Sequence, residues 1–370
     1  MALLLIVWAA TVHAGSPLVI PDGGVLIPDS AGRISELLLS YDPELAGELE
    51  PLYRDLFAQL GPRVHIRVIC PYPADGLAFA QRWQPAATAD ERTVEVVAVG
   101  MPVTIWSRDR CIARQSRSLR QRANVFVPAH SQEYYGEQHN DRMVHGLLSL
   151  AGLLPGLYSS PLHLEGGNVV SNRRHAFIGA NVLIENTDLR RARTLRPELR
   201  RLLGKPHLLV GDGGVPWCHV DMYLTPLDDR TVLVASTTLG NQLLRDAAQA
   251  GDPRAVRWLC EIDESPATAE RFDGVARQVT SRGYRVTRVP ALVHDLGDWM
   301  VTYNNVLLDE RDGARHALVP HYGVALLDDA GRAAYAAQGF HTAGVDVSRI
   351  YTFGGALRCV DPRRGARAST

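Results

Sequence analysis

The sequence predicts an α/β protein built from a repeated supersecondary unit, and two observations support this. Short apolar runs rich in β-branched residues alternate along the chain with longer stretches of helical pattern. Apart from one longer gap, five short polar clusters also recur at a period of about 55 residues. With 370 residues the chain can bury a large core, and no Pro-rich or Ser-rich linker separates two halves. We therefore expect one continuous architecture.

The alternation can be placed on the chain from hydrophobic periodicity. The expected strands lie at 64–70, 93–100, 175–184, 231–237 and 284–289. The expected helices lie at 35–61, 142–154, 194–204 and 266–283. None of these helices is opened by a G-x-G-x-x-G or G-x-x-x-x-G-K-[ST] loop, so nucleotide binding is not indicated.

Composition argues against nucleic acid as a partner. The formal net charge is -1, and Lys205 is the only lysine. The one dense arginine run, residues 190–201, has no interleaved aromatic residues and is interrupted by Pro197, which is typical of a solvated helix face.

Residues 1–14 have features of a secretory signal peptide. An apolar run from Ala2 to Val12 precedes the small-residue site at Val12-His13-Ala14, and the run is too short to span a bilayer. These features predict a periplasmic or secreted protein whose residues 15–370 form a single catalytic domain. Because no basic residue precedes the run, an apolar first strand in a cytoplasmic protein is the alternative.

The chain has five cysteines, and this odd number leaves at least one thiol unpaired. They are Cys70, Cys111, Cys218, Cys260 and Cys359. Neither a C-x-x-C pair nor a Cys/His zinc spacing occurs, so no metal site is predicted.

The five polar clusters are the candidates for a functional site. They read WSRD (106–109), LEGGN (164–168), HVDM (219–222), TYNN (302–305) and GGALRC (354–359). Successive intervals from Asp109 through Glu165, His219 and Asn305 to Cys359 are 56, 54, 86 and 54 positions. Each cluster adjoins an expected strand, so a closed array of such units would direct all five toward one centre.

The residue types in these clusters indicate thiol chemistry on a cation. Cys359 can act as a nucleophile and His219 can transfer protons. The His219-x-Asp221 spacing would place both side chains on one face of a strand. With Asp109 and Glu165, the clusters supply mostly hydrogen-bond acceptors, which suit a guanidinium better than a carbonyl that needs oxyanion donors.

The clusters WSRD, LEGGN, HVDM and GGALRC resemble the ordered signatures of the guanidine-modifying pentein superfamily. The order and spacing are closest to the agmatine deiminase and bacterial-type peptidylarginine deiminase branch, from about Trp106 to Cys359. The resemblance implies a fold of five ββαβ units around a central site. Agmatine deiminases usually carry glycine at the position of Cys218 and a GGGNIHC-like ending in place of GGALRC, so the substrate stays open.

The resemblance also implies a role for each matching residue. Cys359 would be the nucleophile, His219 the general acid and base, and Glu165 the residue that orients His219. Asp109 and Asp221 would bind the guanidinium nitrogens. No cofactor is implied.

Two more residues match the pattern less directly. Asn305 would position the substrate or the backbone, and Trp106 would form an aromatic wall of the site.

Other interpretations of single residues stay open. Cys359 alone would be a buried structural thiol, and His219 with Asp221 would be a metal pair if a third ligand were present. Glu165 would be a turn residue if Gly166 and Gly167 were there for positive φ.

Three functions fit the sequence. The first is a deiminase that hydrolyses a small-molecule or peptidyl guanidine to ammonia and a ureido product. The second is a dimethylargininase-like or amidinotransferase-like enzyme, and the third is a non-catalytic binding module with a pentein fold.

Overall fold

The structure, a computed structural model, describes residues 4–5, 24–116, 124–129, 138–154, 157–211, 217–360 and 364–367. The predicted signal segment 1–14 therefore lies outside the described residues, apart from Leu4–Leu5, which form the short strand β1. Among the described residues no helix is long and apolar enough to cross a membrane.

Four of the five sheets share one chain order, an antiparallel strand pair followed by helices and a parallel strand. The first contains β2 (Gly24–Leu26), β6 (Ile112–Ser116), β7 (Asn124–Ala129) and β8 (Leu157–His163). The second contains β9 (Val169–Ser171), β10 (Ala176–Gly179) and β11 (His207–Val210). The third contains β12 (Leu224–Pro226), β13 (Thr231–Ser236), β14 (Arg285–Val293) and β15 (Met300–Thr302), and the fourth β16 (Leu307–Arg311), β17 (Ala314–His321) and β18 (Phe340–Asp346).

The fifth sheet is built differently and joins the two ends of the described chain. Strands β3 (Arg33–Ser40), β4 (His65–Cys70) and β5 (Thr93–Ala98) are parallel, and β1 pairs with β5. The C-terminal strand β19 (Arg364–Arg367) pairs antiparallel with β3. The segment that carries Cys359 thus returns to the N-terminal sheet.

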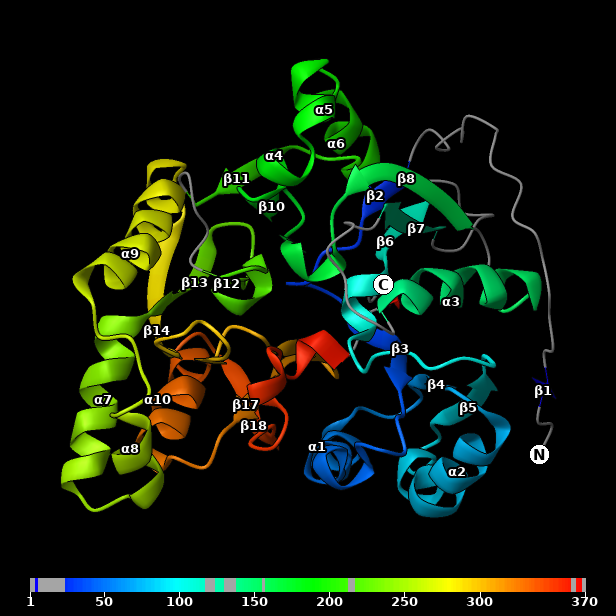
Figure 1. Cartoon of the computed structure of the whole chain (residues 1–370), viewed down its shortest axis with the longest axis horizontal. Helices are drawn as coiled ribbons and strands as arrows, with labels where there is room; N and C mark the ends of the chain where they lie inside the picture. The colour runs from blue at the N-terminus through cyan, green and yellow to red at the C-terminus, as the bar shows by residue number, and fades with distance from the viewer. Residues whose placement is uncertain are drawn as a thin grey trace.

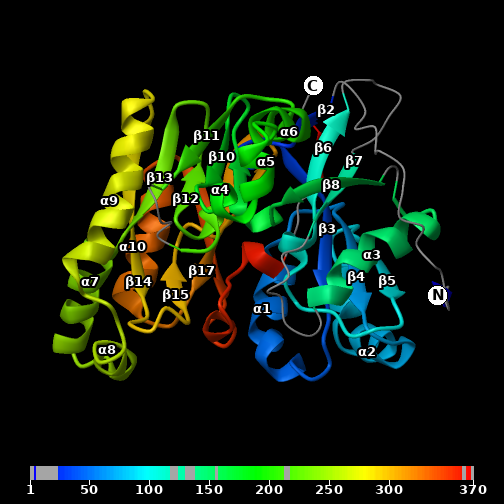
Figure 2. The same cartoon turned by 45° about the horizontal axis from the view of Figure 1, so that its top comes forward.

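Helices surround these sheets (Figure 1). They are α1 (Ala46–Gln59), α2 (Pro73–Ala87), α3 (Gln138–Leu150), α4 (Val182–Glu185), α5 (Thr187–Arg191), α6 (Leu195–Leu203), α7 (Thr237–Gln249), α8 (Pro253–Trp258), α9 (Pro266–Ser281) and α10 (Ala325–Ala336). In both views the red segment that contains the 3₁₀ helix η5 (Arg358–Val360) lies at the centre of the molecule, between the sheet of β3 and the sheet of β13 (Figure 1, Figure 2).

Most expected elements are confirmed, but two boundaries are wrong. The helix expected over 35–61 is strand β3 followed by α1. Leu37, Leu38 and Leu39 are fully buried, because this strand lies inside a parallel sheet. A short continuous apolar run cannot be assigned to helix or strand by periodicity alone. The strand expected over 175–184 ends at Gly179, and α4 follows.

An aromatic group in the main core holds the segment that precedes Cys359. The rings of Trp299 and Tyr351 lie 5.3 Å apart, and those of Trp258 and Tyr351 lie 5.6 Å apart. Trp258 Nε1 donates a hydrogen bond to the Tyr351 hydroxyl at 3.1 Å. Because Tyr351 begins the short 3₁₀ helix η4 (Tyr351–Phe353), this packing sets the direction in which the chain enters the glycine pair before Cys359.

A glycine allows α7 to lie close against β14. A Cβ at Gly240 would lie 2.0 Å from the carbonyl oxygen of Ala291, which is backbone and cannot move aside alone. We expect Gly240→Ala to lower the free energy of unfolding by about 2 kcal/mol or more. Gly274→Ala, in the interior of α9 with no atom closer than 3.8 Å to its Cβ, is the control and should be neutral or stabilising by up to about 1 kcal/mol.

The measurement is urea unfolding of both variants beside the unchanged protein. Equal unfolding midpoints for the two alanine variants would contradict the close packing of α7 on β14.

Candidate active site

Four of the five polar clusters lie on short 3₁₀ helices. These are η1 (Ser107–Arg110), η2 (Gly166–Asn168), η3 (Val220–Met222) and η5 (Arg358–Val360). Asn305 lies between β15 and β16. The expectation that His219 and Asp221 share one face of a strand is therefore wrong. His219 has extended backbone and precedes η3, and Asp221 lies within that helix.

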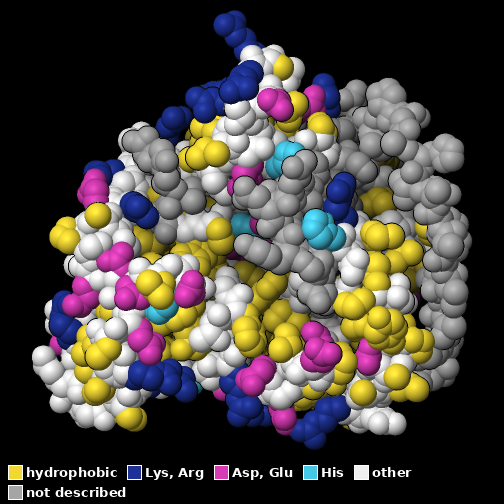
Figure 3. All heavy atoms as spheres, in the orientation of Figure 1, with side chains coloured by type: hydrophobic (Ala, Val, Ile, Leu, Met, Phe, Trp, Pro, Cys, Tyr) yellow, Lys and Arg dark blue, Asp and Glu magenta, His cyan; other side chains and the backbone are white. Residues whose placement is uncertain are grey.

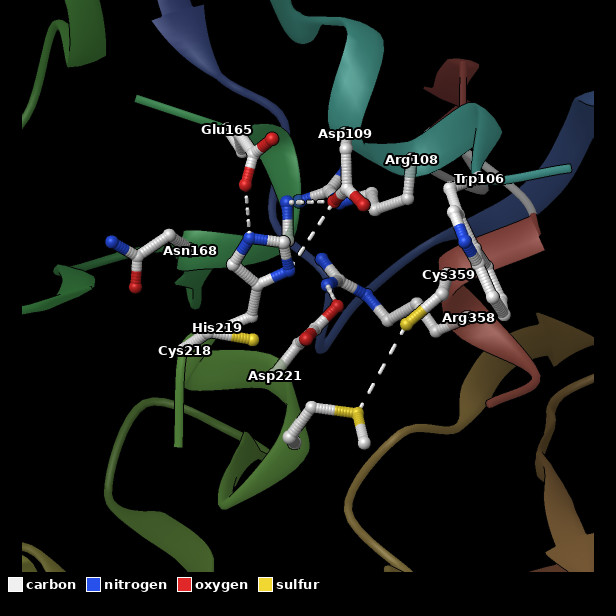
Figure 4. Close-up of polar contacts among 12 residues, drawn as sticks. Trp106, Arg108, Asp109, Glu165, Asn168, Cys218, His219, Asp221, Arg358 and Cys359 are labelled. Carbon is white, nitrogen blue, oxygen red and sulfur yellow. Dashed lines mark hydrogen bonds and ion pairs between the residues drawn. The ribbon is translucent and has the colours of Figure 1, made fainter. Parts of the chain in front are cut away.

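His219 lies between two carboxylates (Figure 4). Its Nε2 is hydrogen-bonded to Glu165 Oε2, and its Nδ1 lies 3.4 Å from Asp109 Oδ1. Burial by itself lowers the pKa of His219, but the charges of Asp109 and Glu165 outweigh burial and hold that pKa well above its usual range. The imidazole is thus positively charged at neutral pH, as a proton donor requires.

Asp109 has an unusual pKa of its own. Burial and the neighbouring charge of Glu165 raise the pKa of the Asp109 carboxyl to about 7, against the opposing effect of His219. The backbone N–H of Gly167 donates to its Oδ1 at 3.1 Å. This carboxyl therefore changes charge near neutral pH.

Gly166 and Gly167 of the cluster LEGGN allow η2 to lie close to η1 and to His219. A Cβ at Gly166 would lie 2.1 Å from the carbonyl oxygen of Arg108, and one at Gly167 would lie 2.6 Å from both Asp109 Oδ1 and His219 Nδ1. Neither glycine has a positive φ. The alternative that Gly166 and Gly167 serve only a turn with positive φ is therefore wrong.

The glycine pair of the last cluster serves two different purposes. Gly354 has φ +87°, a conformation that favours glycine. At Gly355 a Cβ would lie 2.5 Å from Cζ3 of Trp106, so the indole rests on bare backbone there. Trp106 thus lies beside η5 (Figure 4), and its role as an aromatic wall for a substrate stays a prediction.

Asn305 holds Cys359 in place. Its Nδ2 donates to Cys359 Sγ at 3.3 Å, and its Oδ1 accepts from the backbone N–H groups of Arg358 at 2.6 Å and Cys359 at 3.3 Å. The side chain of Asn305 is fully buried. Of the two roles expected for it, these contacts correspond to positioning of the backbone and the thiol.

Cys359 itself is buried and its pKa is high. Burial, followed by the charges of Asp221 and Asp109, raises the pKa of the thiol well above its usual range, and the Asn305 hydrogen bond only partly opposes this. Met222 Sδ lies 4.0 Å from the sulfur. The thiol is therefore protonated at neutral pH until a positive charge comes close to it.

The two oxygens of Asp221 differ in their hydrogen bonding. Its Oδ2 accepts from Nη1 of Arg358 at 2.6 Å, while Oδ1 is buried without a hydrogen-bond partner among the described residues. A second nitrogen of Arg358 donates to Asp29 Oδ1 at 2.5 Å. Sequence reasoning missed Asp29, because the surrounding residues 27–30 form no recognisable motif.

A cavity of about 470 Å³ adjoins the site at Trp106. Its walls include two aromatic side chains besides Trp106, namely Tyr72 and Phe353, the latter from the turn before Cys359. They also include three acidic side chains, Asp42, Glu44 and Asp75. No lysine or arginine is among the described residues that line it. Figure 3 shows acidic and hydrophobic side chains close together on this face of the molecule.

The remaining cysteines do not extend the site into a metal centre. All five thiols are free, with Cys111 buried and Cys218 exposed next to His219. Within the described ranges no group of three or more His, Cys, Asp or Glu side chains is arranged to hold a metal ion.

Comparison with known proteins gives the fold. The chain matches no protein-family model and no curated protein sequence. Among solved structures, the agmatine deiminase of C. jejuni has 17% sequence identity and a TM-score of 0.67, and the match covers 93% of this chain and 97% of that one. The agmatine deiminase of Enterococcus faecalis has 14% identity and a TM-score of 0.65, with 97% and 100% covered.

These likenesses confirm the predicted α/β fold. The chain has the α/β fold of the agmatine deiminases over nearly its whole length. Identities this low establish the fold alone, so the activity has to be argued from the site.

Loss of the Asn305 side chain should make Cys359 harder to ionise. We expect Asn305→Ala to raise the pH midpoint of Cys359 alkylation by iodoacetamide by about one unit, because the donor to the thiolate is removed. Asn304→Ala, which removes a neighbouring buried amide bonded to Thr225 and Leu233 instead, is the control. Mass spectrometry of the Cys359 peptide gives the midpoint, and equal midpoints in the two variants would contradict the assignment.

Proposed function

We propose that this protein is a thiol-dependent hydrolase of a guanidine C–N bond. The observation that carries the proposal is the joint placement of Cys359, His219 and the carboxylates in one buried cluster, with Asp221 Oδ1 left without a partner among the described residues. A protonated guanidine supplies the N–H donors and the positive charge that this set of acceptors lacks.

The substrate guanidinium would lie between Asp109 and Asp221. One N–H donates to Asp221 Oδ1, and others donate to Asp109, whose Oδ1 already accepts from the Gly167 N–H. This arrangement presents the central carbon of the guanidinium to Cys359 Sγ and holds it still.

The reaction then follows in two halves. The Cys359 thiolate forms a C–S bond to the guanidine carbon, and the C–N bond breaks as the imidazolium of His219 protonates the departing ammonia. Neutral His219 next removes a proton from water, whose oxygen attacks the same carbon. The C–S bond breaks, the thiolate is regenerated, and the ureido product leaves. Glu165 keeps the His219 ring oriented through both halves.

Substrate binding also lowers the high pKa of the Cys359 thiol. The charges of Asp221 and Asp109 oppose formation of a thiolate, and a guanidinium placed between them reverses the local charge. The thiol proton then passes to solvent, and the thiolate is formed where its target is bound.

The acidic cavity at Trp106 favours a substrate whose far end carries no carboxylate. Asp42, Glu44 and Asp75 would repel the carboxylate of free arginine and attract an amine or another cationic tail. A guanidine of the agmatine kind fits this charge pattern better than a free amino acid.

We also infer that the five sheets are the units of one closed array around this site. Four sheets show the same strand and helix order, and pairing of β19 with β3 completes the fifth. Export through residues 1–14 stays a prediction.

A panel of guanidines tests the proposal. We expect ammonia and a ureido product from agmatine, weaker turnover of free arginine and arginine peptides, and complete loss of turnover in folded Cys359→Ala. Ammonia release and mass spectrometry of the product are the measurements. Release of an alkylamine from methylated arginines would show that the leaving group is an alkylamine and not ammonia. Full activity in Cys359→Ala would exclude the thiol mechanism.

The pH dependence of kcat/KM follows from two groups, the Asp109 carboxyl and the Cys359 thiol. Asp109, with a pKa of about 7, must be ionised to accept from the guanidinium, so kcat/KM should fall about tenfold per pH unit well below 7. Because the pKa of Cys359 is also raised, kcat/KM should not decline between pH 7 and 8.5. A profile that is flat or falls from pH 5.5 to 8 would contradict the assignment of Asp109.

A further inference from the structure

Four alternating charges are buried behind the nucleophile, and we call them the arginine–aspartate cluster: Arg358, Asp221, Asp29 and Arg108. Arg358 bonds to Asp221 at 2.6 Å and to Asp29 at 2.5 Å, and Arg108 Nη2 lies 3.9 Å from Asp29. The Arg358 side chain is 6% exposed and that of Asp221 only 1%. Two positive and two negative groups balance, which is what allows them to stay charged in the interior.

Residue 358 is fixed at both its backbone and its side chain. Its N–H donates to Asn305 Oδ1, and its guanidinium ends between two carboxylates that come from separate parts of the chain. The planar, forked guanidinium can bond to two acceptors at once, which a single ammonium group does less well. Arg358 therefore connects the peptide that bears Cys359 to the carboxylate that faces the substrate (Figure 4).

We propose that Arg358 is a positioning residue that sets both the orientation and the effective charge of Asp221 beside Cys359. Arg358 occupies Oδ2, so Oδ1 is the oxygen of Asp221 that has no hydrogen-bond partner among the described residues and can accept from a ligand. By neutralising the carboxylate, it makes Asp221 a hydrogen-bond acceptor and not a net negative charge. The part of this inference that concerns substrate binding rests on the proposed function, whereas the part that concerns the thiol does not.

The charge balance of the site gives the reason. With the arginine–aspartate cluster neutral, the remaining groups are Asp109, Glu165 and protonated His219, whose charges sum to one negative. A guanidinium substrate brings that sum to zero. If Arg358 were uncharged, Asp221 would add a second negative charge next to the thiol and oppose its ionisation.

The charged and titratable groups around Cys359 come from several elements. Asp221 belongs to η3, Asp109 to η1 and Arg358 to η5 itself, while the Tyr322 hydroxyl, after β17, donates to the Thr302 carbonyl. Of these, Arg358 is the residue whose charge can be removed without touching a group that would contact the substrate.

Alkylation of Cys359 without substrate tests whether Arg358 neutralises the charge of Asp221 beside the thiol. We expect Arg358→Gln to move the pH midpoint of Cys359 alkylation upward by about one unit, that is, to slow alkylation about tenfold at a fixed lower pH. Arg358→Lys keeps the charge and should leave the midpoint near that of the unchanged protein. Arg92→Gln is the control and should not move it, because this buried arginine bonds to the carbonyls of Leu60, Ala86 and Ala87 and its carboxylate partner is the exposed Asp90, at 3.8 Å.

Steady-state kinetics test whether Arg358 orients Asp221. The substrate is the guanidine that the panel of guanidines identifies. Because a lysine ammonium cannot bridge both carboxylates in the same geometry, Arg358→Lys should raise KM about tenfold while kcat falls less. Asp29→Asn, which keeps Arg358 and Asp221 but weakens the second anchor, should raise KM by a smaller factor.

The outcomes separate this inference from the proposed function. A folded Arg358→Gln variant with an unchanged Cys359 midpoint overturns the charge role, and so does an equal shift in Arg92→Gln. Unchanged KM in both Arg358→Lys and Asp29→Asn overturns the orientation role. If Arg358→Gln does not fold, Arg358→Met, which removes the charge but keeps an unbranched side chain, replaces it for the midpoint. A shifted midpoint with no turnover of any guanidine supports the charge role and contradicts the proposed function.

Discussion

The site depends on the contact of η1 with η2, where backbone meets backbone without intervening side chains. Gly166 makes this possible, since a Cβ there would overlap the carbonyl oxygens of Arg108 and Cys111. That approach brings Glu165 and Asp109 to opposite nitrogens of His219. A larger residue would separate the turns, and His219 would lose the charges that keep it protonated.

The site has two buried parts that differ in charge balance, the arginine–aspartate cluster and the group around His219. The arginine–aspartate cluster is balanced within the protein, so it is a rigid and neutral support for η5. The group around His219 is left with excess negative charge, which raises the pKa of His219, whereas burial, followed by the neighbouring carboxylates, raises the pKa of Asp109. Excess charge that the protein does not neutralise indicates a cationic ligand, and the raised pKa values mark the residues that would handle protons.

The sequence located the residues of the candidate site better than it described their local structure. Trp106, Asp109, Glu165, His219, Asp221, Asn305 and Cys359 were all identified from short clusters at a regular spacing, and the structure brings them together. The strand geometry inferred for His219 and Asp221 was wrong, because a spacing of two residues fits a strand face and a 3₁₀ turn alike. Asp29 gave no signal, because its partners Arg358 and Arg108 lie far from it along the chain and leave no local pattern.

The sequence by itself determined the alternation of strands and helices, the set of polar clusters and the resemblance to guanidine-modifying enzymes, because these are properties of local pattern and order. Only the tertiary structure decided that Asn305 holds the thiol, that Arg358 turns inward to Asp221 and Asp29, and that Gly355 supports Trp106. Each of these depends on the distance between atoms far apart along the chain. Such distances are set by the packing of whole sheets and turns, and no local pattern encodes them.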